Sequence, residues 1–292
     1  MGVEAHPVTE ATADPAPASK QSRAGRNLPA AIGVGLALAA IIISSVFAYP
    51  PSFGVGVVGL AGAYGAFELA TALRAADLQA PRWPLLVGGA TIIAVAFYEG
   101  AAGALAALAG TVAVILLWTR AGGADRWLRD AAAGVLAAAY VPFLASFAAI
   151  LTAPPDGPRR LTTFITTVAF SDIGGYAIGV LSGGKHKMAP RISPGKSWEG
   201  FAGSVLTCVG VATLMLTQLL HVRWWQGVLF GLAMAVCAVV GDLAESAIKR
   251  DIGVKDMGKL LPGHGGILDR LDSLLVAAPV AWLLLSAFRP PH

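Results

Sequence analysis

Two stretches of the chain place acidic, basic and hydroxyl side chains at helical spacing. The first has residues at i, i+3, i+4 and i+7, namely Asp242, Glu245, Ser246 and Lys249. The second repeats the first three positions with Asp269, Asp272 and Ser273. Residues at these intervals share one face of a helix, and carboxylates inside apolar helices are costly enough to mark function by default. Carboxylate oxygens beside cations are the groups that bind a Mg²⁺–nucleotide complex.

Two glycine-rich loops beside these stretches carry much of the positive charge. Residues 183–199 and 248–267 hold eight of the 21 basic residues, mixed with glycine and histidine. Lysine and arginine supply charge to a polyphosphate, and glycine lets backbone N–H groups approach it closely. Anchoring at a membrane surface would explain the basic residues, but it does not explain the glycines, the lone histidine or the interleaved acids.

The alternative for each acid is a local ion pair, such as Asp269 with Arg270 or Glu245 with Lys249. Asp172 lies in a third apolar segment, beside the first of the two loops. Three acid-bearing helix ends next to basic loops favour one shared site over three separate pairs.

The residues just before Asp269 suggest how a phosphate could be held. Gly265 and Gly266 directly precede a predicted helix, whose free N–H groups would attract a phosphate oxygen. His264, set among these glycines, is a candidate for phosphate binding or proton transfer. Glu68, far away in the sequence, is expected to make an interior polar contact outside the site.

The composition excludes a water-soluble domain. Of the 292 residues, 56% are hydrophobic and 13% are charged, whereas soluble domains carry about 25% charged residues. A membrane-spanning helix needs about 20 mostly apolar residues. The chain is therefore predicted to be an all-α, polytopic integral membrane protein. Two cysteines in apolar runs cannot build a disulfide framework.

About nine transmembrane helices fit the apolar runs. They are expected at 29–49, 53–73, 84–99, 101–119, 131–151, 161–182, 201–220, 225–247 and 268–288. Residues 1–28 are predicted to be a disordered cytoplasmic tail, 29–160 an amino-terminal helical region, and 161–292 a carboxy-terminal catalytic region with both motif loops. Nine spans place 17 of the 21 basic residues on the side of the amino terminus. That asymmetry predicts a cell-membrane protein whose amino terminus and site are cytoplasmic.

The two loops carry a resemblance to a known family. From Ser246 to Asp272 the chain reads SAIKRDIGVKDMGKLLPGHGGILDRLD. This stretch resembles the signature of phosphatidate cytidylyltransferases, or CDP-diacylglycerol synthases: S-x-apolar-K-R, four residues, K-D, and after a spacer H-G-G-x-x-D-R-x-D. Every fixed position is filled. Asp172 with Tyr176, and the run SPGKSWEG at 193–200, resemble upstream elements of the family; Gly195 departs from the lysine that many members have there.

The resemblance implies that CTP and phosphatidic acid react to give CDP-diacylglycerol and pyrophosphate in phospholipid biosynthesis. It also implies a metal centre with Mg²⁺ and a second metal that is divalent or monovalent, both bound by Asp242 and Asp269. The expected partners are membrane lipids and a second copy of the chain in a homodimer, and no nucleic acid is expected. The expected catalytic residues are Asp242, Asp269, Lys249, Arg270 and Asp272. The expected substrate-binding residues are Asp172, Ser193, Lys196, Ser197, Glu199, Arg250, Lys255, Asp256, His264, Gly265 and Gly266.

Three other functions are alternatives to this one. A transporter for an anionic solute would show inverted repeats and charges near the midplane, and the sequence shows neither. A related CTP-using enzyme, such as a polyprenol kinase or an archaeal-type CDP-lipid synthase, is a nearer alternative, although the complete signature argues against the kinase. A CDP-alcohol phosphotransferase would need a D-G-x-x-A-R element, which is absent.

Overall fold

The computed structural model describes residues 44, 52–123, 126–258, 260 and 265–288. Its elements are α2 (Ser52–Ala72), the 3₁₀ helix η1 (Leu73–Ala76), α3 (Arg82–Ala121), α4 (Trp127–Ala138), the π-helix η2 (Ala139–Phe143), α5 (Leu144–Thr152), α6 (Gly157–Leu181), β1 (Lys187–Ala189), β2 (Ser193–Ser197), α7 (Trp198–Leu219), α8 (Trp224–Asp251) and α9 (Leu268–Phe288).

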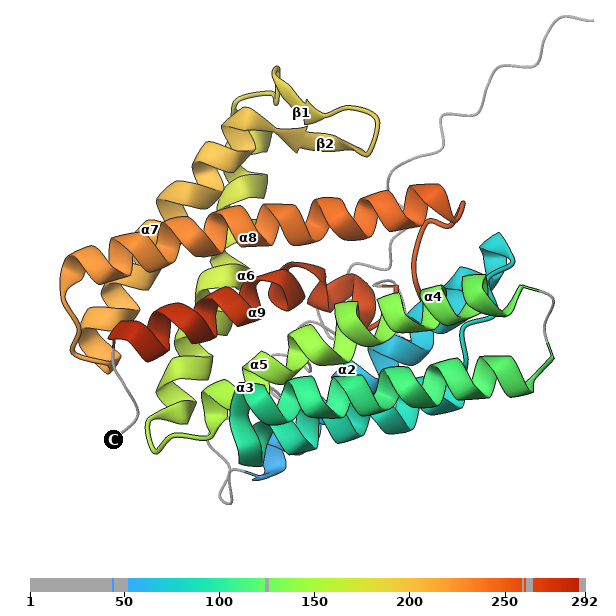
Figure 1. Cartoon of the computed structure of the whole chain (residues 1–292). Helices are drawn as coiled ribbons and strands as arrows, with labels where there is room; N and C mark the ends of the chain where they lie inside the picture. Colours follow the sequence, from blue (N-terminus) through green and yellow to red (C-terminus); the bar gives the residue numbers. More distant parts are fainter. Residues whose placement is uncertain (1–43, 45–51, 124–125, 259, 261–264, 289–292) are drawn as a thin grey trace, which may run out of the picture.

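The chain is an all-α polytopic membrane protein. By length and composition, seven helices within the described residues could cross a membrane. One of them, the 40-residue α3, is predicted as two spans at 84–99 and 101–119. Gly100 has φ 67° and ψ −156° inside it, a conformation that only glycine adopts readily. The helix bends back there, so that its two arms lie side by side (Figure 1). The predicted first span, 29–49, lies almost wholly outside the described residues, and the count of nine stays a prediction.

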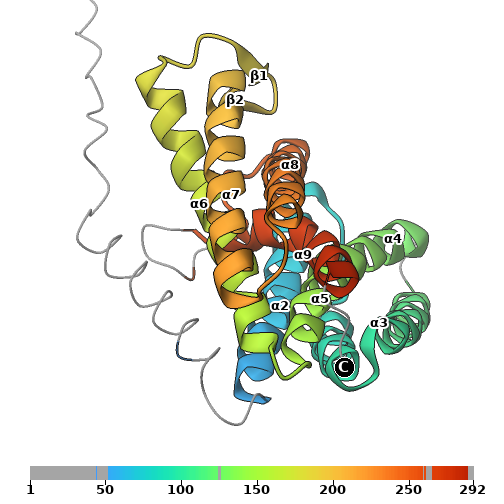
Figure 2. The same cartoon turned by 90° about the vertical axis from the view of Figure 1, so that its left-hand side faces the viewer.

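Helices α8 and α9 lie between two groups of helices, α2–α5 on one side and α6–α7 on the other (Figures 1 and 2). At its beginning α9 packs through Leu268 and Leu275 into the core of the α2–α5 group. Further along, Ala281 and Leu285 pack into a second core with Phe164 of α6. Helix α9 as a whole is therefore held by both groups, its start by α2–α5 and its later part by a core that includes α6. The predicted boundary between residues 160 and 161 stays a prediction.

A short hairpin joins α6 to α7 where the sequence predicts only a loop. Strands β1 and β2 pair antiparallel, with Lys187 opposite Ser197 and Ala189 opposite Ser193. The hairpin satisfies backbone groups that would otherwise lack partners as the chain turns between two helices. Ser197 then begins α7, because its side-chain oxygen accepts a hydrogen bond from the Gly200 N–H at 3.1 Å. This end of β2 also carries Lys196 toward α8.

Candidate active site

Asp242 of α8 lies where the hairpin, α8 and α9 meet. Its carboxylate forms an ion pair with Lys196 of β2, and Ser273 of α9 donates its hydroxyl hydrogen to Asp242 Oδ1 at 3.0 Å. Lys196 also interacts electrostatically with Asp172 of α6 and Asp272 of α9. Burial lowers the pKa of the Lys196 ammonium, while the two carboxylates oppose that shift. Four elements thus contribute to one charged cluster.

Lys249 organises a second cluster at the end of α8. Its ammonium nitrogen is 2.6 Å from Glu245 Oε2 and 2.6 Å from Asp269 Oδ1. Both carboxylate side chains are almost fully buried, with exposed fractions of 2% and 4%. The local ion pair between Glu245 and Lys249 is therefore present. Lys249 also forms a second ion pair with Asp269 of α9, so the pair is not isolated. Asp272 connects the two clusters, because it interacts electrostatically with Glu245 and Lys249 of one cluster and with Lys196 of the other.

Asp269 folds the second motif loop back onto the start of α9. Its carboxylate accepts hydrogen bonds from the Gly266 N–H at 2.7 Å and from the Met257 N–H at 3.0 and 3.1 Å. The sequence predicts that the Gly265–Gly266 N–H groups face a phosphate. For Gly266 the structure differs, because the carboxylate three residues later already accepts that hydrogen. The Gly266 N–H therefore positions Asp269 and is not free for a ligand.

Glu68 of α2 reaches the same loop from the amino-terminal half. Its side chain is 4% exposed, and Oε2 accepts a hydrogen bond from the Leu268 N–H at 2.9 Å. The Ile267 backbone is a further hydrogen-bond partner. Gly266 packs so closely that an added Cβ would lie 2.5 Å from Glu68 Oε2. Glu68 makes the predicted interior contact, but it also positions the motif loop. The only sequence signal for this role is a carboxylate in an apolar helix.

We expect Glu68→Ala to lower kcat by about 10–100-fold, the usual effect of removing a group that orients a site residue. The buried Leu268 N–H would lose its acceptor, which costs about 1–3 kcal/mol of stability. Glu68→Gln keeps an acceptor oxygen and should retain more activity than Glu68→Ala. Glu99→Ala, at an exposed glutamate, is the matched control. Turnover and thermal unfolding of the purified variants measure both effects. Normal turnover by Glu68→Ala would show that the loop is positioned without Glu68.

A pocket of about 560 Å³ opens beside Lys196, between α6, the hairpin and α7. Its lining includes Asp172, Tyr176, Ser193, Lys196, Ser197 and Phe201. Four of the predicted substrate-binding residues therefore share one cavity, which adjoins the Asp242 cluster. Tyr176 is 76% exposed, so one wall of the pocket continues onto the outer surface of α6.

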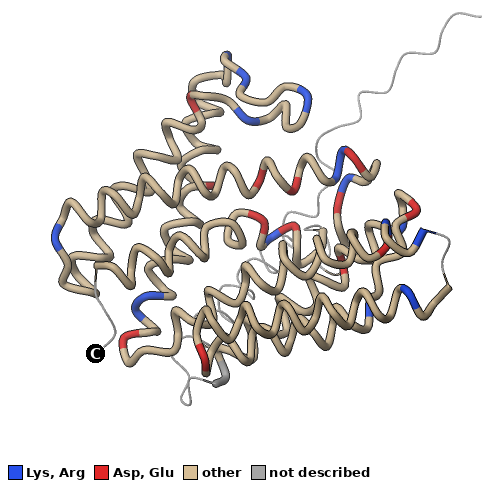
Figure 3. Tube along the Cα trace, viewed as in Figure 1, with Lys and Arg blue, Asp and Glu red and all other residues tan. Residues whose placement is uncertain are grey.

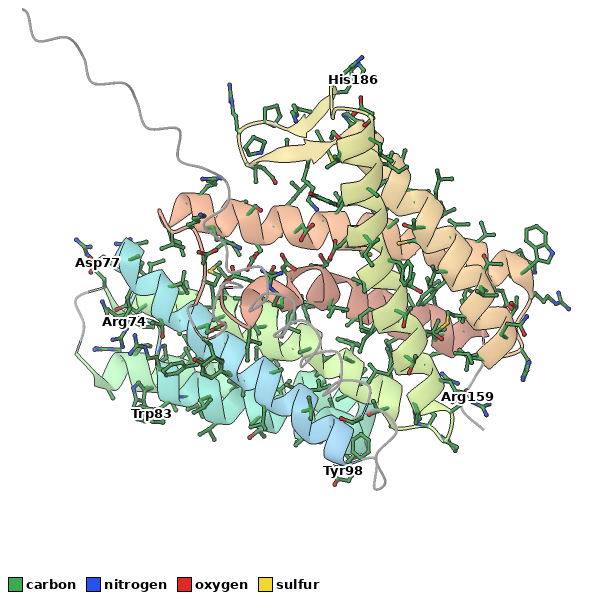
Figure 4. All side chains as sticks on the ribbon, turned by 180° about the vertical axis from the view of Figure 1, so that it is seen from behind. Arg74, Asp77, Trp83, Tyr98, Arg159 and His186 are labelled. Atoms are coloured by element: carbon green, nitrogen blue, oxygen red, sulfur yellow. The ribbon has the colours of Figure 1, made fainter. Side chains whose placement is uncertain are left out.

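The remaining predicted site residues have different surroundings. Glu199 does not line the pocket; it accepts hydrogen bonds from the His186 N–H, and its Oε1 is 2.6 Å from His186 Nδ1, which ties α7 to the hairpin. Figure 4 shows His186 at the end of that hairpin where it joins the helices, and its carbonyl accepts a hydrogen bond from the Trp198 N–H at 2.9 Å. Arg250 Nε donates to the Ile192 carbonyl at 3.3 Å, so the end of α8 also contacts the hairpin.

Four further residues complete the set. Arg270 is exposed and interacts electrostatically with Asp172. Lys255 and Asp256 are exposed on the motif loop. His264 lies outside the described residues. Figure 3 shows acidic positions along α8 and at the start of α9, with basic positions on the hairpin and at the end of α8.

The carboxylates fit a hard cation that takes few protein ligands. Glu245 Oε1 is buried and has no hydrogen-bond partner within the described residues, and the side chain interacts electrostatically with Asp272. The described part of the chain brings no three His, Cys, Asp or Glu side chains together in a preformed metal cage. Mg²⁺ typically uses one or two carboxylates and completes its shell with water and phosphate oxygens. Asp242 and Asp269 can serve such an ion, although each now contacts a lysine.

Comparison with known proteins places these motifs in a family context. Residues 29–288 match the model of the cytidylyltransferase family. A phosphatidate cytidylyltransferase of Mycobacterium bovis is 42% identical over 283 residues, covering 92% of this chain and 92% of the relative. One from Mycobacterium leprae is 44% identical, covering 90% and 89%. The uncharacterized protein YnbB of Escherichia coli K12 is 47% identical over 127 residues, covering 43% and 42%.

Proposed function

This chain belongs to the cytidylyltransferase family and is a membrane nucleotidyltransferase, and we propose that it makes CDP-diacylglycerol from CTP and phosphatidic acid. A phosphate oxygen of phosphatidic acid attacks the α-phosphorus of CTP. The bond from that phosphorus to the oxygen bridging the α- and β-phosphates breaks, and pyrophosphate leaves with the bond's electron pair. The observation that carries this proposal is the ion pair of Lys196 with Asp242, because Lys196 also lines a pocket large enough for a nucleotide.

Lys196 is placed to bind the phosphates of CTP. Its side chain lines the pocket and is 30% exposed, so a ligand in the pocket can reach it. The hydroxyls of Ser193 and Ser197 line the same wall. Arg270, exposed at the start of α9, and Arg250, next to the hairpin, add guanidinium groups that suit phosphate oxygens. These side chains orient the triphosphate and neutralise the pyrophosphate as it leaves.

Lys249 has a different part in the proposal. Because its ammonium is bonded to two buried carboxylates, it holds Asp269 in place more readily than it binds substrate. Asp242 and Asp269 would hold Mg²⁺, and Asp172 and Asp272 would support them from α6 and α9. When bound, the metal supplies charge that neutralises the attacking and leaving oxygens.

We place the reaction at the cytoplasmic membrane face. The 17-to-4 distribution of basic residues supports this orientation, and CTP is water-soluble. The lipid must arrive from the bilayer. Tyr176 and Val180, exposed on α6 and lining the pocket, offer an apolar route along which acyl chains can stay in the membrane.

We expect Lys196→Ala to lower kcat/KM for CTP by about 10²–10³-fold, the usual cost of removing one donor to charge that develops in the transition state. The assay follows CDP-diacylglycerol formation by purified protein. Lys185→Ala is the control, because Lys185 is exposed just before the hairpin and does not line the pocket. Near-normal turnover by a folded Lys196→Ala protein would contradict phosphate binding at this site.

A further inference from the structure

A second cavity lies at the end of the α3 hairpin, bounded by the η1–α3 connection, both ends of α3 and α4. Its volume is about 320 Å³. The lining includes Arg74, Arg82, Trp83, Trp118, Thr119 and Asp130. None of its lining residues belongs to the pocket beside Lys196. The cavity is therefore a separate place in the fold, and the proposed reaction does not use it.

The two arginines of this cavity have no acidic partner in the described part of the chain. Arg74 and Arg82 interact with each other as like charges, and neither forms an ion pair with any described residue. Arg82 Nε is buried and finds no hydrogen-bond acceptor among the residues that the structure describes. The guanidinium lies over the Phe67 ring, 5.4 Å from the centroid. Two adjacent cations and a buried orphan donor destabilise the empty site and favour an anion.

The acids and bases nearby do not neutralise this pair. Asp130 is the one acid that the described lining contains, against two arginines. Its Oδ1 accepts the Gln79 N–H at 2.8 Å, and among the described residues it forms no ion pair with either arginine. At the rim, Asp77 is paired with Arg126 at 3.3 Å. Arg129 adds another cation, which donates to the Ala76 carbonyl. Asp125 lies outside the described residues. The described charge at this end of the protein is thus predominantly positive.

The cavity lies at a depth where lipid head groups are expected. Trp83 and Trp118 in its lining are 67% and 56% exposed, and exposed tryptophans at the ends of apolar helices mark the membrane–water interface. Arg74 and Trp83 lie at the same end of the molecule (Figure 4). Both ends of α3 lie at the end of the bundle toward which α8 runs to meet the motif loop (Figure 1). An anion bound here would be on the same membrane side as the reaction site.

We propose that this cavity binds the phosphate of an anionic phospholipid, as a lipid site separate from the reaction site. The two guanidinium groups donate to the phosphate oxygens, and the exposed tryptophan rings contact the glycerol backbone and the first part of the acyl chains. The volume is little more than half that of the pocket beside Lys196, which suits one head-group phosphate better than a nucleotide triphosphate.

Native mass spectrometry of the detergent-purified, full-length protein tests this proposal with phosphatidylglycerol, phosphatidylcholine and inorganic phosphate as probes. Wild-type protein should bind phosphatidylglycerol in preference to phosphatidylcholine. Arg74→Gln and Arg82→Gln should each weaken the phosphatidylglycerol affinity by about tenfold, the effect of losing one charge-assisted hydrogen bond. Arg120→Gln removes an exposed charge from the same end without touching the cavity, and should bind like the wild type.

Four outcomes would overturn the proposal. The first two are unchanged phosphatidylglycerol binding by the double variant Arg74→Gln/Arg82→Gln, and a loss of phosphatidylglycerol affinity in Arg120→Gln equal to that in the cavity variants. The third is phosphatidylcholine binding as tight as phosphatidylglycerol binding. The fourth is displacement of phosphatidylglycerol by millimolar inorganic phosphate, which would indicate a soluble anion as the occupant. Thermal unfolding checks that each variant is folded. If replacing Arg82 prevents folding, Arg74→Gln alone decides the question, because Arg74 is exposed.

Discussion

Asp242→Asn is expected to abolish turnover, with a loss of about 10³-fold or more, while the protein stays folded. Asparagine keeps the shape of aspartate and can still accept the hydrogen of the Ser273 hydroxyl. It cannot form the ion pair with Lys196 or offer a charged oxygen to a metal. The Asp242 side chain is 18% exposed. Water can therefore partly solvate the groups that lose their charged partner, and the free energy of unfolding should change less than it would at a fully buried site. Activity should therefore fall far more than stability.

CDP-diacylglycerol formation and thermal unfolding are measured on the same Asp242→Asn preparation. Asp251→Asn is the matched control, since Asp251 is exposed at the end of the same helix. Loss of a charged metal ligand should leave much less than a few per cent of wild-type turnover. Turnover above a few per cent would therefore contradict metal binding by Asp242. An Asp242→Asn protein that unfolds would show that its role is structural.

Lys249→Met is expected to have the largest effect on stability, at about 3–5 kcal/mol, because it removes the cation from a buried cluster. Glu245 and Asp269 would remain nine-tenths buried or more without their shared partner. Asp269 would also be held less firmly against the Met257 and Gly266 N–H groups. Activity should fall together with stability, unlike in Asp242→Asn.

A double variant shows how much of the stability lost in Lys249→Met comes from unpaired buried charge and how much from lost packing. Lys249→Met/Glu245→Gln removes one of the two stranded carboxylates, so it should recover part of the stability that Lys249→Met loses. Lys185→Met, at an exposed lysine, should unfold like the wild type. If Lys249→Met has a wild-type unfolding midpoint, the Glu245–Lys249–Asp269 contacts do not stabilise the fold.

Local spacing was enough to predict the helices and the polar faces that carry the site. Asp242, Glu245 and Lys249 share a face of α8, because a helix repeats every 3.6 residues whatever surrounds it. The bend in α3 could also be predicted, since Gly100 interrupts an apolar run too long for one span. Both predictions use interactions within a few residues of sequence.

Contacts between distant segments could not be predicted in this way. Glu68 and Leu268 are 200 residues apart, and Lys196 and Asp242 are 46 apart. No periodic pattern links such positions, because the packing of whole helices brings them together. The partner of the Gly266 N–H illustrates the same limit at short range: helix-terminus chemistry predicts that an anion binds there, and the fold supplies Asp269 as that anion.

The most direct test of nucleotidyl transfer to a lipid phosphate is product formation by the purified full-length protein, with CTP and phosphatidic acid supplied together and separately, in Mg²⁺ or in excess EDTA. We predict equal amounts of CDP-diacylglycerol and pyrophosphate only when both substrates and the divalent metal are present. Undiminished product in excess EDTA, or pyrophosphate released from CTP without phosphatidic acid, would contradict the account.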